Sequence, residues 1–288
     1  MSTPGVRSSG TLFVVATPIG NLGDVSQRAL DTLRACDRIL AEDTRRTRQL
    51  LTHFGIRARV ERLDAHAREQ NLTGVVARLC AGESMALVTD AGTPGVSDPG
   101  EALVEEAIRH SVRVVPIPGP SAVTAALVAS GLAAGGRFRF VGFLPRAGGA
   151  RRAAIAVVCE TPEPVVLFES PQRTGATLLE LARETPDRHA CVAREVTKVH
   201  EEFIRGILSD LAAESRAWRG EITIVLGAQT LASAAAGVGG DFDEQIDEAL
   251  SRGERSRAIA ERLADQIGVP RRVVYARVLE RKTRILRP

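Results

Sequence analysis

The run from Met85 to Gly100 (MALVTDAGTPGVSDPG) limits what this chain can fold into more than any other segment. An apolar strand pattern stops at Asp90, and a loop of small residues follows it. This pattern is typical of an α/β ligand site, because a strand end delivers backbone amides and one acidic side chain to a crevice. Asp98 and Pro99 predict the N-cap and first residue of the next helix. The alternative is a tight turn that Asp90 merely caps.

Two further loops of this kind also follow apolar strand patterns. One follows residues 12–16 and reads TPIGNLGD, and the other follows residues 112–116 and includes PGPSA at 118–122. Loops after parallel strands meet at one edge of a sheet, so three of them predict a single crevice and favour a ligand site. None matches G-x-G-x-x-G or G-x-x-x-x-G-K-[ST], so dinucleotide and P-loop sites lose their main support.

The composition indicates an ordinary soluble globular protein. The 288 residues can bury one large core or two medium ones, and the net charge is only +3. Only two of the 38 basic residues are lysines, which genomic base composition explains as readily as RNA binding. The four cysteines are widely spaced without C-x-x-C, which argues against a zinc site and a disulfide framework. We therefore expect a cytoplasmic protein with no metal, no signal peptide and no membrane helix.

Strand and helix patterns alternate from the start, which predicts βαβ units and an α/β fold. In the first half the expected strands are 12–16, 37–41, 59–63, 85–90 and 112–117, with helices at 26–35, 44–54, 72–80 and after Asp98. In the second half we expect a helix to Gly131, strands at 138–143, 164–168, 190–194 and 222–226, and a helix at 172–182. The predicted organisation is a flexible tail (1–11), an N-terminal α/β domain (12–118), a C-terminal α/β domain (119–230), a linker (231–240) and a small helical, helix-turn-helix-like domain (241–288).

Eight motifs occur in order along the chain: Thr17–Leu22, Ala41–Arg45, Asp90–Pro94 with Ser97–Gly100, Pro118–Ala122, Gly142–Pro145, Phe168–Arg173, Ala193–Lys198 and Arg219–Ile222. Together they resemble the tetrapyrrole methylase superfamily, and more closely its branch that methylates small-subunit ribosomal RNA. The resemblance covers nearly the whole chain. It implies a two-domain tetrapyrrole methylase-like fold, here with a small C-terminal all-helical module, that forms a homodimer. It also implies S-adenosyl-L-methionine bound between the lobes and 2′-O-methylation of a cytidine in the decoding region of 16S rRNA.

The resemblance also implies which residues bind the cofactor. They are Pro18, Asp90, Thr93, Ser121 and Ala122 from the first domain, with Phe168 or Glu169, Ala193 and the strand after Gly220 from the second. A carboxylate such as Asp90 suits a sulfonium or ammonium cation. Two alternatives remain open: Ser121 can be an ordinary N-cap, and Phe168 can be a core residue.

Methyl transfer to a ribose requires a general base that removes the hydroxyl proton, or a cation that lowers the pKa of the hydroxyl, because a ribose hydroxyl is a poor nucleophile. Glu42 and Asp43 follow the second predicted strand and are expected on the same edge as the three loops, and Lys198 lies in the second domain. We rank them as candidate catalytic residues in that order. The alternative for Glu42 and Asp43 is a charged start to the helix at Thr44.

Two arginine clusters predict contact with RNA phosphates. Arg45, Arg46 and Arg48 follow the Glu42–Asp43 pair, while Arg146, Arg151 and Arg152 flank Gly148–Ala150 in a segment expected to be mobile. The alternative is a solvated helix face.

The chain departs from the family branch at Asp64–Glu69 (DAHARE), where the branch has a His-Asn-Glu pattern and only His66 matches.

The helical tail, with arginines at 271–272, also allows a sequence-specific DNA binder. The enzyme-like body argues against DNA as the partner, so we expect the tail to grip rRNA or pack on the body. Methylation of a precorrin or protein substrate, and a non-catalytic nucleotide- or RNA-binding protein, are the alternative functions.

Overall fold

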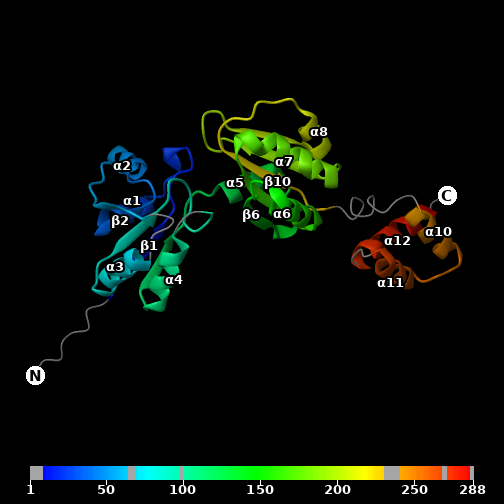
Figure 1. The fold of residues 1–288 in the computed structure, drawn as a ribbon, viewed down its shortest axis with the longest axis horizontal. Helices are drawn as coiled ribbons and strands as arrows, with labels where there is room; N and C mark the ends of the chain where they lie inside the picture. The colour runs from blue at the N-terminus through cyan, green and yellow to red at the C-terminus, as the bar shows by residue number, and fades with distance from the viewer. Residues whose placement is uncertain (1–8, 64–68, 98–99, 230–240, 268–270, 286–288) are drawn as a thin grey trace, which may run out of the picture.

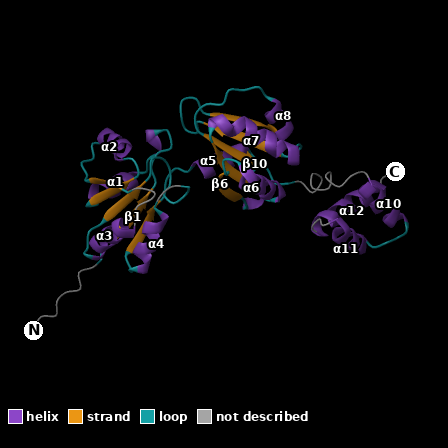
Figure 2. Ribbon diagram, viewed as in Figure 1, coloured by secondary structure: helices purple, strands orange, loops and turns teal. Residues whose placement is uncertain are grey.

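The computed structural model describes residues 9–63, 69–97, 100–229, 241–267 and 271–285 (Figure 1). The strands form two separate groups, and a third part consists only of helices (Figure 2). The predicted α/β class and the C-terminal helices are therefore confirmed. The exact domain boundaries stay a prediction, and the expected linker at 231–240 lies outside the described residues.

The first sheet is parallel throughout, with strand order β3-β2-β4-β1-β5. Its strands are β1 (Thr11–Val15), β2 (Arg38–Ala41), β3 (Val60–Arg62), β4 (Met85–Val88) and β5 (Arg113–Ile117). Its helices are α1 (Gln27–Ala35), α2 (Thr44–His53), α3 (Glu69–Cys80) and α4 (Glu101–Arg109), with a 3-10 turn at Leu22–Asp24. The topology places the carboxyl ends of β1, β4 and β5 side by side.

Helices cover both faces of this sheet. Leu30 and Leu33 of α1 pack with Ile39, while Val76 and Leu79 of α3 pack with Leu40 on the opposite face. Neighbouring strand residues point to opposite faces, so a central parallel strand is apolar along its whole length. This explains the continuous apolar run of β4, in which all four residues are buried.

The second sheet is mixed, with strand order β6-β7-β10-β8-β9. Its strands are β6 (Arg139–Phe143), β7 (Val165–Glu169), β8 (His189–Arg194), β9 (Glu202–Ile207) and β10 (Ile222–Leu226). Its helices are α5 (Ala122–Ser130), α6 (Gly148–Glu160), α7 (Pro171–Glu184) and α8 (Leu208–Ala213), with a 3-10 turn at Ala134–Gly136. Helix α5 packs on one face, and α6, α7 and α8 share a core on the other.

Arg188 connects the second sheet to its helices from inside the core. Its side chain is fully buried and donates to the carbonyl oxygens of Val158, Thr161 and Gly227 at 2.8 to 3.0 Å. Burying a charge is costly unless hydrogen bonds satisfy it, and here backbone carbonyls do so. The guanidinium thereby fixes the end of α6 against β8 and β10.

The C-terminal module has its own small core. It consists of α10 (Asp241–Ser251), α11 (Ser256–Ile267) and α12 (Arg271–Ile285). Phe242, Ile246, Leu263 and Val278 are buried together. None of the described helices is long and apolar enough to cross a membrane.

Three expectations from the sequence need correction. The segment around Gly148 is not a mobile loop, because α6 begins there. The N-terminus of α6 has no side-chain cap, so the sequence lacks the usual signal for a helix start. Strand β9 and helix α8 were not predicted. Helix α4 has Gly100 at its N-cap, and Asp98 and Pro99, predicted to start it, lie outside the described residues, as does His66.

Candidate functional site

The three predicted loops meet at the carboxyl edge of the first sheet. Thr17 and Gly92 exchange two backbone hydrogen bonds of 2.9 and 3.1 Å, which join the loops after β1 and β4. Thr93 Oγ1 donates to the carbonyl oxygen of Pro120 at 3.2 Å, which joins the loops after β4 and β5. Gly92 has φ +87, a left-handed conformation that favours glycine. The prediction of one crevice is confirmed, and three unrelated turns are excluded.

An apolar cavity of about 360 Å³ lies between these loops and the second sheet. Of the residues predicted to bind the cofactor, it brings together Thr93, Ser121, Ala122, Phe168 and Glu169. Ser121 is the N-cap residue of α5, but its side chain makes no capping hydrogen bond. Ser121 is therefore the N-cap residue, as the alternative had it, while its hydroxyl is still available to a ligand, so the two roles coexist.

Phe168 belongs both to the core and to the cavity wall. Its ring lies 5.0 Å from that of Phe140 and 5.6 Å from that of Phe143, between ring centroids. Both Phe143 and Phe168 line the apolar cavity. The two readings of Phe168 are thus compatible.

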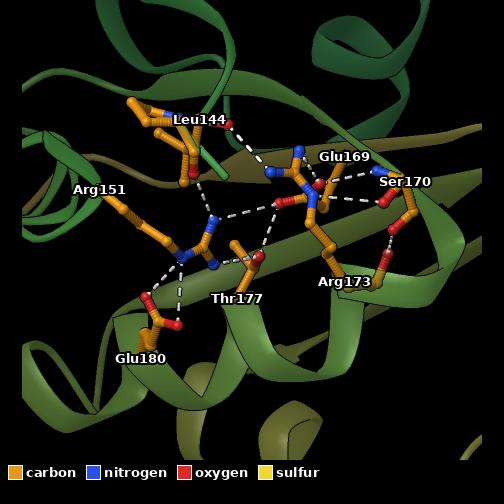
Figure 3. A network of polar contacts seen from close by, with 9 residues as sticks. Leu144, Arg151, Glu169, Ser170, Arg173, Thr177 and Glu180 are labelled. Atoms are coloured by element: carbon orange, nitrogen blue, oxygen red, sulfur yellow. Dashed lines mark hydrogen bonds and ion pairs between the residues drawn. The ribbon is translucent and has the colours of Figure 1, made fainter. Parts of the chain in front are cut away.

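Glu169 supports this wall through its carboxylate, which points into the protein (Figure 3). The carboxylate accepts hydrogen bonds from the backbone N–H of Ser170 at 2.7 Å and from Thr177 Oγ1 at 2.6 Å. It also pairs with Arg173 at 2.6 Å. Only the Glu169 backbone is free to border the cavity, so its side chain does not suit the direct cofactor contact that was expected.

Arg151 belongs to the same buried network, which corrects its predicted role. Its side chain is 8% exposed and donates to Glu180, Thr177 and the carbonyl oxygen of Pro145 at 2.9 to 3.1 Å. Figure 3 shows Arg151 between Glu180 and Glu169. Each of its three nitrogens already donates to a protein oxygen, so the structure assigns Arg151 to the fold rather than to RNA phosphate, although it borders the third cavity with Arg146 and Arg152.

Ala193 lies behind the cavity rather than in its wall. It is completely buried in β8 and is paired with Thr223 of β10, which does line the cavity. Its expected cofactor contact is therefore indirect at most, through the position of Thr223.

A polar cavity of about 550 Å³ adjoins the apolar one, and Ile19, Ala91 and Glu221 line both. Pro18 and Asp90, which were expected to bind the cofactor, line the polar cavity. The Asp90 carboxylate accepts a hydrogen bond from the backbone N–H of Asp43 at 3.1 Å and lies 3.4 Å from the Arg46 guanidinium.

The three candidate catalytic residues have different electrostatic surroundings. Burial, followed by the nearby charge of Asp90, raises the pKa of Glu42. The pKa of Asp43 is lowered, mainly because its carboxylate accepts a hydrogen bond from the Arg45 backbone N–H as the N-cap of α2. The helix-start interpretation is therefore confirmed for Asp43, while Glu42 makes no such cap.

Lys198 reaches the polar cavity from the second sheet. Its ammonium lies 2.9 Å from Glu195 and 3.1 Å from Glu221, and these carboxylates outweigh burial and raise its pKa. A lysine held charged in this way cannot act as a base near neutral pH, but it fits the other expected role, a cation that lowers the pKa of the hydroxyl. Lys198 lies close to Gly20, where an added Cβ would be only 2.4 Å from Lys198 Cγ.

The remaining arginines of the two clusters are exposed. Arg45, Arg46 and Arg48 lie on the first turns of α2. Arg146 and Arg152 line a third cavity of about 560 Å³ together with Arg183, which the sequence reading did not identify. These side chains are positioned where phosphates can reach them.

Sequence reasoning also missed Glu195 and Glu221. Glu195 Oε1 accepts the backbone N–H of Glu221 at 2.8 Å, and this bond is the main reason for the lowered pKa of Glu195. The Glu in the Arg219–Ile222 motif was the available signal. Within the described residues, no group of three or more His, Cys, Asp or Glu side chains is arranged to hold a metal ion.

The chain is similar in fold to solved structures that include methyltransferases and a synthase. The chain matches a diphthine synthase crystal structure with a TM-score of 0.57 and 21% identity, covering 76% of this chain and 90% of the other. It matches a uroporphyrin-III-C-methyltransferase from Thermus thermophilus with a TM-score of 0.56 and 18% identity, covering 76% of this chain and 94% of the other. At these identities the matches establish the fold alone.

The family follows from the sequence comparisons. The family model described as Tetrapyrrole (Corrin/Porphyrin) Methylases matches residues 11–212, so the chain belongs to this family. A ribosomal RNA small subunit methyltransferase I from Halalkalibacterium halodurans is 38% identical over 92% of this chain and 93% of its own length. The protein of the same name from Xylella fastidiosa is 46% identical over 78% of this chain and 82% of its own length. The chain is accordingly a methyltransferase that uses S-adenosylmethionine, as predicted.

Proposed function

We propose that this chain methylates the 2′-hydroxyl of a cytidine in small-subunit ribosomal RNA, with S-adenosylmethionine bound in the apolar cavity. The observation that carries the proposal is the joining of the loops after β1, β4 and β5 around that cavity. The relatives named as small-subunit ribosomal RNA methyltransferases support the substrate. Precorrin and protein methylation have only the shared fold in their favour.

The residues around the apolar cavity fit this cofactor. The Gly92 N–H and carbonyl are already paired with Thr17, but the absence of a side chain at Gly92 lets a ligand approach the backbone around Thr93, which suits the adenine or the amino-acid end. The uncapped Ser121 hydroxyl adds a polar contact, and Phe143 and Phe168 shield the site from water. When bound, the cofactor supplies an electrophilic methyl group on a sulfonium sulfur.

The polar cavity supplies the acceptor side of the reaction. Because the two cavities share Ile19, Ala91 and Glu221, a ribose hydroxyl held beside Asp90 faces the place where the methyl group is presented. Holding both reactants in line lowers the barrier without any further chemistry. The Asp90 carboxylate is itself fixed by the Asp43 N–H.

Glu42 is the proposed base. The hydroxyl proton would pass to a carboxylate as the ribose oxygen takes the methyl carbon and the carbon–sulfur bond breaks, which releases the cofactor as a neutral thioether; a carboxylate with a raised pKa is the better proton acceptor. Glu42 lies beside Asp43, whose N–H binds the Asp90 carboxylate, and burial followed by the Asp90 charge raises the pKa of Glu42. Glu42 is not among the residues that line the two cavities, so this role requires the ribose hydroxyl to reach it from the Asp90 end. Asp43 serves instead as the N-cap of α2, and Lys198 orders Glu195 and Glu221.

The exposed arginines extend this site toward RNA. We propose that Arg45, Arg46 and Arg48, with Arg146 and Arg152, contact phosphates of the substrate in the small ribosomal subunit. The homodimer is likewise a proposal, and light scattering of the purified chain tests it.

The test is incubation with tritium-labelled S-adenosylmethionine and either small ribosomal subunits, free 16S rRNA or a corrin precursor. We expect label in the rRNA of the small subunit, at one nucleotide that resists alkaline hydrolysis because its 2′-oxygen is methylated. Label in the corrin precursor alone, or on the base rather than the ribose, would refute the proposed function.

A further inference from the structure

The polar cavity has two features that binding of the methyl donor does not explain. Within the part of the chain that the structure describes, the hydroxyls of Thr89 and Thr197 are the two buried side-chain polar atoms without a hydrogen-bond partner. Thr89 is 3% exposed and lines the polar cavity. Thr197 Oγ1 lies 3.0 Å from where a Cβ on Gly20, another lining residue, would stand. Unpaired buried hydroxyls are costly, so the Thr89 hydroxyl in the cavity wall, with that of Thr197 close to Gly20, points to a polar ligand.

The loop that carries Thr197 is also strained. Glu195 and Thr197 have φ values of +51 and +70, which residues with a side chain rarely adopt. Hydrogen bonds hold this conformation: Glu201 Oε2 accepts the Thr197 backbone N–H at 2.6 Å, and Lys198 donates to Glu195 at 2.9 Å. Strain that is held in place beside a cavity is typical of a binding site.

One face of α2 forms the long wall of this cavity. Arg46, Gln49, Leu50 and His53 all line it, at the spacing that places residues on one side of a helix. Arg46 lies at the Asp90 end, 3.4 Å from that carboxylate. A helix rises 1.5 Å per residue, so His53 lies about 10 Å farther from Asp90 along the helix axis.

The two ends of the cavity therefore differ chemically. The end near Asp90 adjoins the apolar cavity and suits the ribose, whereas the far end presents the Gln49 carboxamide and the His53 imidazole. The imidazole stands edge-on to Phe54, with 4.8 Å between ring centroids. Pro18 and Leu22 add apolar surface to the cavity wall.

This arrangement matches how proteins read unpaired RNA bases. Sequence-specific recognition of RNA takes single nucleotides whose bases are unstacked, held on apolar or aromatic surfaces and hydrogen-bonded along their edges. A carboxamide can accept from the cytosine amino group and donate to the adjacent ring nitrogen. Uracil reverses both of these positions, and a carboxamide turned by 180° would match it, so selection of cytosine requires that the bound RNA and the cavity hold the Gln49 amide in one orientation.

We propose that the polar cavity receives one unstacked nucleotide of the RNA, with its ribose beside Asp90 and Thr89 and its base recognised by Gln49 and His53. This inference rests on the proposed function and adds to it the residues that select the base. Gln49 and His53 are specificity residues, and Thr89 positions the ribose.

The experiment compares Gln49→Ala and His53→Ala with matched controls on other helices. Gln27→Ala on α1 and His110→Ala on α4 remove the same side-chain types from exposed positions. For each variant, kcat and KM are measured with small subunits carrying either the natural cytidine or uridine at the target position. Affinity for S-adenosylmethionine is measured separately by calorimetry.

We expect each cavity variant to lose about tenfold in kcat/KM for the cytidine substrate, as befits one lost hydrogen bond to the base. Its preference for cytidine over uridine should fall by a similar factor, while cofactor affinity and both controls stay unchanged. Thr89→Val, which keeps the shape of the side chain, should lower kcat at unchanged cofactor affinity.

Unchanged kcat/KM and base preference in both cavity variants would overturn the inference and leave the proposed function standing. A wild-type chain that binds the cofactor but methylates no ribosomal RNA would overturn the proposed function, and with it an RNA ligand for this cavity.

Discussion

The backbone N–H of Asp43 donates to the carboxylate of Asp90, with 3.1 Å between Asp43 N and Asp90 Oδ1. The bond joins the residues that follow β2 and β4, two neighbouring strands of the first sheet. It fixes the start of α2, whose face lines the polar cavity, relative to the loop that lines both cavities. One carboxylate thus sets the geometry of the acceptor side.

Replacing Asp90 separates its charge from its hydrogen bond. Asp90→Asn keeps an oxygen acceptor for the Asp43 N–H, so we expect stability within about 0.5 kcal/mol of wild type and a lower kcat. Asp90→Ala leaves the Asp43 N–H without its partner, so it should lower kcat and also lower the free energy of unfolding by about 1 kcal/mol. Urea unfolding and methylation assays measure the two effects. Equal stability losses in both variants would contradict this role.

Glu42 should control the pH dependence of methylation. Because burial and Asp90 raise its pKa above 4.5, activity should increase with pH through that raised value, as Glu42 becomes a base. Glu42→Gln should abolish this increase and lower kcat about 100-fold or more, with unchanged cofactor affinity. A pH profile of kcat that is the same in Glu42→Gln and wild type would rule Glu42 out.

The same pKa shift predicts an effect on stability. A carboxyl whose pKa is higher in the folded state opposes folding when it ionises, so its cost appears as pH rises from 4.5 through the raised value. Glu42→Gln should therefore have a higher melting temperature than wild type at pH 7 and an equal one at pH 4. Calorimetric melting at the two pH values checks the sign, and a lower melting temperature at pH 7 would contradict it.

Arg151 and Arg152 are neighbours with opposite expected roles. Arg151→Ala leaves buried Glu169 with one cation fewer and should cost about 3 kcal/mol of unfolding free energy. Arg152→Ala, at an exposed position, should leave stability unchanged. It should reduce the slope of log affinity for RNA against log salt concentration by about 1, the value for one lost phosphate contact. Chemical denaturation and binding at several salt concentrations distinguish them. A stability loss in Arg152→Ala and a change in salt dependence in Arg151→Ala would contradict these roles.

Removing the helical module tests its part in substrate binding. The module has a separate core, so deletion of residues 241–288 should leave both sheets folded. We expect weaker rRNA methylation with unchanged affinity for S-adenosylmethionine. If methylation of small subunits is unaffected, the module does not contact the rRNA.

The sequence predicted the first sheet well because its signals are local. Apolar runs such as Met85–Val88 end at small-residue loops, and parallel pairing then places those loops together. The second sheet was harder, since β10 pairs antiparallel with strands distant in sequence and β9 is only partly buried. No apolar pattern marked β9 for that reason.

The site was predictable where one loop carries it and not where several segments converge. Ser121 and Thr93 stand directly after strands, so their place at the edge followed from the topology. Arg151 looked like part of an exposed basic cluster, and only the packing of α6 on α7 shows that it is buried. Likewise Lys198 reaches Gly20 across the two sheets, a contact that no local pattern encodes.

The central claim is that the apolar cavity binds S-adenosylmethionine, and isothermal titration of wild type and Ala122→Phe with that cofactor tests it most directly. Ala122 lines the cavity from the first turn of α5, so the larger side chain fills the space of the ligand. We predict one saturable site per wild-type chain and no measurable binding to a folded Ala122→Phe variant. No heat with wild type, or equal affinity in both proteins, would contradict the account.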